Sequence, residues 1–200
     1  MARTQAQDYF EKRDVILHQA AQLFAEHGYT GTSISMIAKA CGVSKALLYH
    51  YYPDKEAVLF GILHAHLTAL VECVTQVVAQ TPPGEAQLLA IGEALLDSYR
   101  DAHAEHQVQI ANLKLLPEES QAILRELERQ LVAPVASAIA VALPELVKTP
   151  ALKPLTMAWF GMINWHYLWY REGRGFSRAD FARMACKLIV AGGAQVLQPV

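Results

Sequence analysis

Apolar residues recur every three or four positions along most of this chain, a spacing that places them on one face of an α-helix. No useful stretch alternates apolar and polar residues as a half-buried strand would. Glycine and proline interrupt the pattern and mark the helix ends. The pattern predicts an all-α fold of about nine helices, at approximately 9–27, 34–41, 45–51, 55–79, 85–107, 109–115, 118–143, 155–171 and 178–197.

The third predicted helix, 45–51, runs into the aromatic sequence "YHYY" at positions 49–52. These four adjacent side chains cannot all point into one core, because successive residues of a helix point in different directions. A tight turn containing Gly42 joins this helix to the one at 34–41, and the pair is typical of a helix-turn-helix. We expect Leu48 to face the core with one of the last two tyrosines, which leaves the other side chains to solvent or a partner.

A recognition helix of this kind presents its first residues to base edges in the major groove and its flanks to phosphates. Lysine can donate to guanine, apolar side chains can contact the thymine methyl group, and tyrosine and histidine can donate to phosphates. Free N–H groups at the start of the preceding helix also favour an anion. The candidate DNA-binding residues are Ser33, Ser35, Ser44, Lys45, Ala46, Leu47, Tyr49, His50, Tyr51 and Lys55.

Charge alone does not identify the partner. The chain carries a formal net charge of −2, and residues 1–56 contain six basic and six acidic side chains. Any DNA-binding surface must therefore be local. The alternative is a helical protein-interaction module without DNA binding, which would be favoured if Lys45→Ala and Tyr49→Ala left all partner binding unchanged.

Residues 16–59 strongly resemble the N-terminal domain of TetR-family repressors, through the segments "AAQLFAEHGYTGTS", "IAKACGVSK" and "LYHYYPDKE". The resemblance implies an all-helical homodimer that binds double-stranded operator DNA. The family's DNA contacts match all the candidates above except Ser44, which we expect to cap its helix. Cys41 stands where a small residue is usual and Tyr52 where phenylalanine is common, and neither lies on the expected DNA-facing side.

The first three helices are expected to bury a small core of their own, and the fourth leads out of it. We therefore predict a helix-turn-helix DNA-binding domain at 1–53. The resemblance implies that the remainder, 54–200, is a ligand-binding and dimerisation domain.

The helix at 155–171 is apolar on all sides and must be buried on several faces. One stripe contains Leu155, Trp159, Met162, His166 and Trp169. A second contains Ala158, Gly161, Trp165 and Leu168. We expect one stripe to lie in the core of a monomer and the other to meet a two-fold partner. This helix and the last one, which carries small residues at 191–194, would form a four-helix bundle in a homodimer. An ordinary monomer core is the alternative.

The segments 112–119 and 160–184 also resemble one branch of the family, whose members regulate fatty-acid, sterol and aromatic-acid breakdown. Some of them bind acyl-CoA thioesters, so the resemblance suggests a small acyl-CoA-type or aromatic inducer that releases a repressor from its operator. Polar side chains inside an apolar bundle are the candidate contacts, because burial demands hydrogen-bond partners. The candidates, for each of which a structural hydrogen bond is the alternative, are Tyr99, His103, Asn112, Asn164, His166 and Tyr167.

The common enzyme signatures GxSxG, P-loop, GxGxxG and HExxH are all absent, so we expect no enzyme, no catalytic residues and no cofactor. The three cysteines are far apart and form no CxxC motif, which favours a reducing cytoplasm without a disulfide or structural metal. A metal held by His103 and His106, with Asp97 and Asp101 nearby, is a minor alternative.

We expect no membrane partner. The N-terminus contains acidic and basic residues without the apolar stretch of a signal peptide. The uncharged run at 154–170 is shorter than the roughly 20 apolar residues that a membrane-spanning helix needs.

Overall fold

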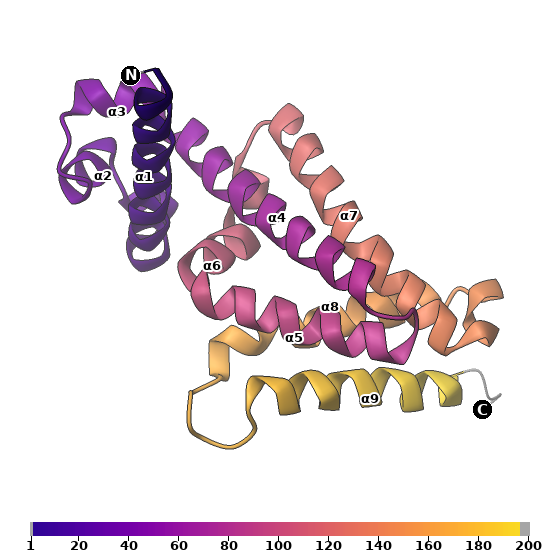
Figure 1. The fold of residues 1–200 in the computed structure, drawn as a ribbon. Helices are drawn as coiled ribbons and strands as arrows, with labels where there is room; N and C mark the ends of the chain where they lie inside the picture. Colours follow the sequence, from indigo (N-terminus) through magenta and orange to yellow (C-terminus); the bar gives the residue numbers. More distant parts are fainter. Residues whose placement is uncertain (1, 197–200) are drawn as a thin grey trace. The chain divides into compact units, whose positions relative to one another are not determined.

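The computed structural model describes residues 2–196, and within them the regular elements are helical, which confirms the all-α prediction. Two short 3₁₀ helices, η1 (Leu113–Leu115) and η2 (Pro144–Lys148), lie between longer elements. The α-helices in this range are α1 (Ala2–Gly31), α2 (Ile34–Ala40), α3 (Lys45–Tyr51), α4 (Lys55–Gln80), α5 (Glu85–Asp101), α6 (His103–Asn112), α7 (Glu118–Ala142), α8 (Leu152–Trp169) and α9 (Arg178–Val196) (Figure 1).

Most predicted boundaries agree with these bounds within a few residues, but two were wrong. The break between the fifth and sixth helices lies at Ala102, with φ −124° and ψ 48°, and not near residue 108. No glycine or proline marks this break in the sequence. At the other end of the chain, α1 begins earlier than predicted and is interrupted at Gly28, whose φ of 73° favours glycine. The predicted end of the last helix, at residue 197, lies outside the described residues.

The chain divides into two compact units, which we describe separately. The N-terminal unit contains the residues up to Leu67 together with 102–125, and the C-terminal unit contains 68–101 and the residues from Glu126 onward. Both α4 and α7 therefore contribute residues to each unit. The units do not coincide with the two functional domains expected from the sequence, because α6 groups with α1–α3.

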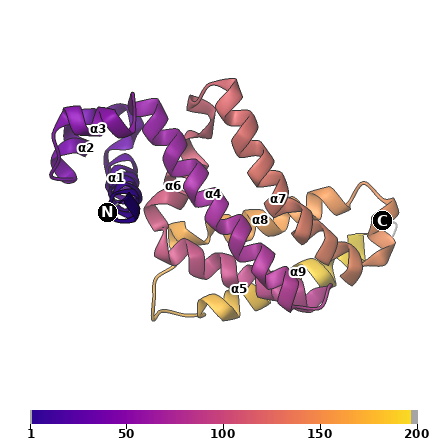
Figure 2. The same ribbon diagram turned by 45° about the horizontal axis from the view of Figure 1, so that its top comes forward.

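The core of the N-terminal unit is built from the inward faces of α1, α2, α3 and the start of α4 (Figure 2). Gly61 of α4 permits close packing, since a Cβ at this position would lie 2.9 Å from Leu17 Cδ2 and 3.0 Å from Tyr52 Cε1. Val15 belongs to the apolar pattern of α1 but is 52% exposed, so it lies at the edge of the core and not inside it. The buried side chains of this core include Ile16, Ala20, Phe24, Ile37, Leu48, Tyr52, Val58 and Leu59.

In the C-terminal unit, α9 packs along α5 and α8 (Figures 1 and 2). Trp159 of α8 is completely buried, and Gly92 of α5 leaves room for it, because a Cβ there would lie 3.2 Å from Trp159 Cζ2. The start of α9 is fixed by the predicted capping box. Ser177 N donates to Asp180 Oδ2 at 3.2 Å, and Asp180 N donates to Ser177 Oγ at 3.1 Å.

Among the described residues, α4 is the helix that is long and apolar enough to span a membrane, with a mean hydropathy of 1.8 over its best window. Half of that window is buried inside the structure. A core helix of a soluble protein has the same length and composition, so this helix is weak evidence for a membrane span.

Candidate functional site

The helix-turn-helix is closed by two serine caps and one glycine turn. Ser33 Oγ accepts from Met36 N at 3.2 Å at the start of α2, and Ser44 Oγ accepts from Leu47 N at 3.1 Å at the start of α3. Gly42 has a φ of 65°, which only glycine adopts at no steric cost. The sequence therefore determines both the start of α3 and the turn that precedes it.

The side chains of α3 divide into an inner and an outer group. Leu48 is completely buried, and Tyr52, directly after the helix, is nearly so. Tyr51 is half-buried. The candidate DNA-binding residues of α3 that are exposed to solvent are Lys45, Ala46, Leu47, Tyr49 and His50. The aromatic run is thus split, with Tyr49 and His50 outside and Tyr52 inside. Ser33, Ser35 and Ser44 are also exposed.

Lys55 has a structural role that the sequence did not indicate. Its Nζ donates to the backbone carbonyls of Tyr29, at 2.8 Å, and Thr32, at 2.9 Å, and lies 4.4 Å from the centre of the Tyr29 ring. The ammonium therefore ties the start of α4 to the chain that follows Gly28. An ammonium has three donors, so these two bonds leave one more donor on Lys55.

Two residues of α1, Tyr9 and Arg13, contact the end of α3, and sequence reasoning missed both. The Tyr9 ring stacks on Tyr51 with 4.8 Å between centroids and 29° between planes. Arg13 Nε donates to the hydroxyl of Tyr52 at 2.9 Å. Burial raises the pKa of Tyr52, although the arginine opposes the shift, so the phenol stays neutral. The spacing of four between Tyr9 and Arg13 puts them on one helix face but does not show what that face contacts.

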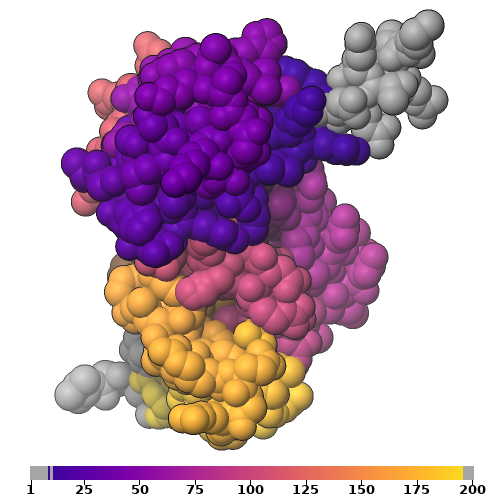
Figure 3. Space-filling view, turned by 90° about the vertical axis from the view of Figure 1, so that its left-hand side faces the viewer, coloured from indigo at the N-terminus to yellow at the C-terminus, as the bar shows by residue number. Residues whose placement is uncertain are grey.

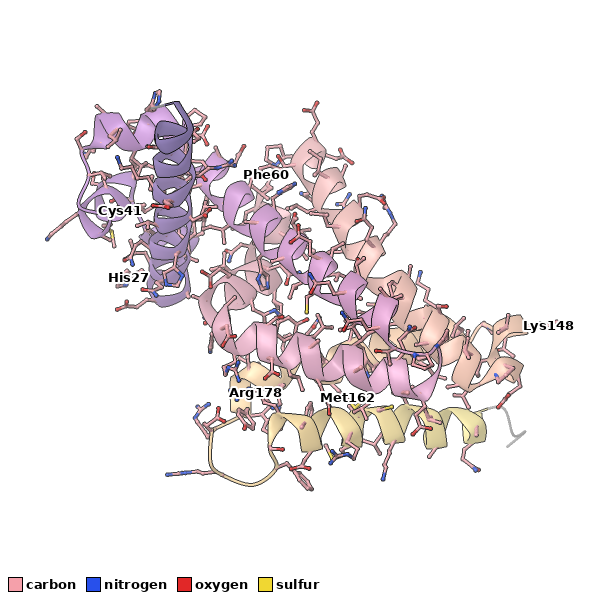
Figure 4. The ribbon with its side chains drawn as sticks, in the orientation of Figure 1. His27, Cys41, Phe60, Lys148, Met162 and Arg178 are labelled. Carbon is pink, nitrogen blue, oxygen red and sulfur yellow. The ribbon has the colours of Figure 1, made fainter. Side chains whose placement is uncertain are left out.

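A cavity of about 230 Å³ lies between α1 and the helix-turn-helix. Cys41, labelled in Figure 4, lies at its α2 side, and Figure 3 shows part of the surface that α1, α2 and α3 form, in indigo to purple. Burial raises the pKa of the Cys41 thiol, which keeps it protonated and weakly reactive. The lining residues are Glu11, Lys12, Val15, Ile16, Cys41, Val43, Leu47 and Tyr51.

Two family models match the chain. The model "Bacterial regulatory proteins, tetR family" covers residues 16–62, and the model "Tetracyclin repressor-like, C-terminal domain" covers residues 81–192, more than half of the chain. The chain belongs to the TetR family. This family consists of bacterial transcriptional regulators, not enzymes, which bind operator DNA, dimerise and bind small-molecule ligands.

Relatives agree with this assignment. The crystal structure of a TetR-family transcriptional regulator from Bordetella parapertussis 12822 matches with a TM-score of 0.84 and 35% identity, over 94% of this chain and 98% of that chain. YuxN of Bacillus subtilis (strain 168), an uncharacterized HTH-type transcriptional regulator, is 46% identical over 54 residues, which are 27% of this chain and 19% of YuxN. This chain covers less than half of the curated relatives that it matches. It covers 19% of YuxN, 39% of YerO of Bacillus subtilis (strain 168) and 40% of FasR of Mycolicibacterium smegmatis.

A third comparison shows the fold alone. AibR, whose crystal structure was solved with isovaleryl coenzyme A and operator DNA, is 24% identical to this chain with a TM-score of 0.78. The match covers 88% of this chain and 97% of AibR.

In this TetR-family chain, the C-terminal unit brings together two of the predicted ligand-binding residues. The Tyr99 hydroxyl donates to Asn164 Oδ1 at 2.8 Å, and Tyr99 is buried. Burial raises the pKa of Tyr99 well above its ordinary value, so the hydroxyl remains a neutral donor. Tyr167 is half-buried, and burial raises its pKa as well. The Tyr99–Asn164 bond gives each of these groups a hydrogen-bond partner within the protein.

His166 lies in an aromatic cluster of the same unit. Its ring stacks on Tyr170 at 4.3 Å and lies 4.7 Å from Phe181, and Arg178, labelled in Figure 4, covers the Tyr170 ring at 4.6 Å. Burial and the charge of Arg178 lower the pKa of His166 to about 4, so the imidazole is neutral near pH 7. Its Nε2 is buried and makes no hydrogen bond with any described residue.

The other two predicted ligand-binding residues belong to the N-terminal unit and stand at opposite ends of α6. His103 is exposed, and Asn112 donates to the carbonyl of Val108 in its own helix at 3.0 Å. Neither unit therefore gathers all six candidates.

A metal held by His103 and His106 was the minor alternative, and the structure places these two side chains in different surroundings. His103 is exposed, whereas His106 is completely buried beside His66, with 5.7 Å between ring centroids. Asp97 and Asp101 both pair with Arg100. In the described part of the chain, no three histidine, cysteine or acidic side chains come together as a metal site would require.

Proposed function

We propose that this protein is a ligand-responsive transcriptional repressor that binds double-stranded operator DNA in the cytoplasm as a homodimer. The exposed side of α3 is the observation that carries the proposal. Lys45, Tyr49 and His50 offer donors there, while Ala46 and Leu47 offer apolar contacts, the mixture that base edges and phosphates require. Two copies of α3 would read half-sites about one DNA turn, roughly 34–36 Å, apart.

The exposed faces of α8 and α9 support dimerisation through these two helices. All four members of the second predicted stripe, Ala158, Gly161, Trp165 and Leu168, are exposed, with Trp165 at 54% and Leu168 at 48%. A contiguous apolar face of this kind marks an interaction surface. The first stripe is not uniformly inside, because Trp169 is 55% exposed.

The α9 face adds a hollow suited to a neighbouring helix. Leu188 is 56% exposed, and Ala191 and Gly192 beside it carry little side chain, so another backbone can come close. A cavity of about 500 Å³ on this face is lined by Phe176, Asp180, Arg183, Met184, Lys187, Leu188, Ala191 and Gly192. A second copy that places its own α8 and α9 here completes a four-helix bundle.

The inducer we propose is an acyl-CoA-type thioester or a small aromatic compound. The isovaleryl coenzyme A complex of AibR, a fold neighbour, supports the acyl-CoA class. His166 Nε2 is buried and the ring is neutral, so it suits a ligand group that accepts one hydrogen bond, such as a thioester carbonyl. A carboxylate would need a counter-ion there and fits less well. A ligand can release the operator only by binding the non-DNA-binding state more tightly than the other.

In vitro selection from a random-sequence duplex library tests DNA binding. The full chain should enrich a two-fold symmetric sequence, and its affinity should fall steeply as salt rises. Lys45→Ala should lower affinity for that sequence, and Lys148→Ala, which removes an exposed lysine from η2 (Figure 4), should not. Failure of the full chain to enrich any sequence would contradict the proposal.

Isovaleryl coenzyme A, free coenzyme A and benzoate serve as probes for the inducer. An active probe should raise the melting temperature and release the selected duplex at the same concentration. We expect isovaleryl coenzyme A to release the duplex and free coenzyme A not to release it. If benzoate alone releases the duplex, the inducer belongs to the aromatic class. His166→Phe should weaken the binding of the active probe about tenfold. His64→Phe, at an exposed position of α4, should leave this binding unchanged.

A further inference from the structure

One face of α1 contacts the end of α3. Tyr9 and Arg13 are four residues apart on α1 and therefore share a face. Tyr9 stacks on Tyr51, the last residue of α3. Arg13 donates a hydrogen bond to the hydroxyl of Tyr52, the next residue. The two contacts differ in kind, because Tyr52 is a buried core residue, whereas Tyr51 is half-buried and a candidate DNA contact.

The remaining side of α3 that faces α1 is not packed. The cavity of about 230 Å³ separates Val15 and Ile16 of α1 from Leu47 and Tyr51 of α3. Contact across a gap contributes little dispersion energy, so apolar packing does not fix the rotation of α3 on this side. Within α3 itself, Leu48 is the residue anchored in the core, so the rotation of this short helix also depends on the contacts made at its ends.

Tyr51 also contacts its neighbour on the DNA-facing side. The rings of His50 and Tyr51 lie 5.7 Å apart in a T-shaped arrangement with 79° between planes. A chain of aromatic contacts thus runs from Tyr9 through Tyr51 to His50, from α1 to the exposed side of α3. Stacked and T-shaped pairs have preferred geometries, so movement of the first ring would change the preferred position of the last.

We propose that Tyr9 is a positioning residue for DNA recognition, which fixes the orientation of the exposed side of α3 by stacking on Tyr51. The inference rests on the proposed DNA-binding function. The stacking contact with Tyr51 is made by the face of the Tyr9 ring, which phenylalanine also provides, so phenylalanine can replace Tyr9 in this role. Its removal lowers discrimination between sequences more than it lowers affinity for DNA in general, because general affinity comes from charges that Tyr9 lacks.

The test measures the affinity of the full chain for the duplex selected by the wild type and for a scrambled duplex of equal length. Tyr9→Ala should lower the ratio of the two affinities roughly 3- to 10-fold, the factor that corresponds to the usual strength of an aromatic pair. Tyr9→Phe should keep the ratio within about twofold of the wild type. The dependence of affinity on salt should be the same in all three proteins, since no charge changes.

A double-mutant cycle separates positioning from direct contact. If Tyr9 acts through Tyr51, then Tyr9→Ala has no further effect on the ratio in a Tyr51→Ala background. Additive losses would show that Tyr9 contacts DNA by itself and would overturn the inference, as would an equal loss in Tyr9→Phe. Val15→Ala, which trims an exposed wall of the cavity outside the stack, is the matched control and should leave the ratio unchanged.

Two further results distinguish the possible failures. If the wild type enriches a sequence and Tyr9→Ala discriminates as well as the wild type, the positioning role is wrong while DNA binding stands. If the wild type enriches nothing, the proposed function fails and the positioning role fails with it. Urea unfolding of each variant shows whether lost discrimination accompanies lost folding, and loss fully explained by unfolding would also overturn the inference.

Discussion

Helices α3 and α8 both leave aromatic side chains in solvent, to a similar extent. Tyr49 of α3 is 50% exposed and Trp165 of α8 is 54% exposed. Their surroundings differ, because Lys45 and His50 accompany Tyr49, whereas Leu168 and Gly161 accompany Trp165. An exposed ring among hydrogen-bond donors suits a polyanion, and an exposed ring on an apolar face suits another apolar face. Exposure alone therefore does not distinguish the two partners that we propose, DNA for α3 and a second copy for α8, whereas the neighbouring side chains do.

The two helices are also held in place differently. The 18 residues of α8 carry a buried stripe that includes Trp159 and Ile163, so its own core face fixes its rotation. The seven residues of α3 bury Leu48 alone. A short helix with one core residue depends on caps and neighbours, which is why Ser44, Tyr9 and Arg13 matter to it.

Loss of the apolar α8 face should have the largest effect on operator affinity, because it should separate the two protomers. Trp165→Glu combined with Leu168→Glu places charges at the proposed dimer interface, so the protein should sediment as a monomer. A monomer engages one half-site, and operator affinity should fall by about 100-fold or more. Leu115→Glu, an exposed apolar residue of the N-terminal unit, is the control and should leave assembly unchanged. A double variant that remains dimeric would remove α8 from the interface.

Neighbouring leucines of α3 should separate stability from recognition. Leu48→Ala removes a fully buried side chain and should lower the free energy of unfolding by roughly 2–5 kcal/mol. Leu47→Ala, at a 37% exposed position, should change it by less than about 0.5 kcal/mol while altering the selected DNA sequence. Urea unfolding and repeated selection measure the two effects. Equal destabilisation by both changes would mean that α3 is buried on two sides.

The buried histidine of α8 should make the stability of the protein depend on pH. The pKa of His166 on α8 falls to about 4 on folding from an ordinary value near 6.5, so the unfolded chain binds more protons between these values. The stability that depends on neutral His166 is present above pH 6.5 and is lost as pH falls toward 4, by up to about 1.4 kcal/mol per pH unit. His166→Phe should flatten this part of the pH–stability curve in urea unfolding.

Substitution of two lysines near α3 should have the smallest effects on affinity for DNA. Lys45→Ala should relax base preference with an affinity loss of about tenfold or less. Lys55→Ala should weaken binding to all sequences and reduce the salt slope by about one. It should also lower stability by roughly 1–3 kcal/mol, because the carbonyls of Tyr29 and Thr32 lose their partner. Fluorescence anisotropy on selected and scrambled duplexes at several salt concentrations measures the binding effects, and equal, sequence-blind losses would contradict both roles.

Sequence reasoning succeeded where local chemistry determines structure. The bounds of α3 were predicted to the residue, because Ser44 caps its start and Pro53 follows its end. The capping box of α9 and the two stripes of α8 were identified from spacing, which did not tell which stripe is exposed. Each of these features depends on residues within a few positions of one another, so periodicity and capping rules were sufficient.

Features that depend on distant segments were missed. The break at Ala102 has no glycine or proline, and its position follows from where α6 packs against α1. Val15 fits the apolar period of α1 but lies beside a cavity. The stacking of Tyr9 on Tyr51 joins residues 42 positions apart in the printed sequence, so no local pattern could show it. Likewise, sequence polarity could not tell that His103 and Asn112 belong to a different unit from Tyr99 and Asn164.

The empty space beneath Leu47 bears on how such regulators diverge. Leu47, which we propose as a base contact, lines a cavity, so it can be exchanged for a larger or smaller residue without disturbing the buried Leu48 beside it. Single substitutions at this position should therefore retarget the protein to new promoters while leaving it intact, so that a lineage can acquire new target genes without passing through misfolded ancestors.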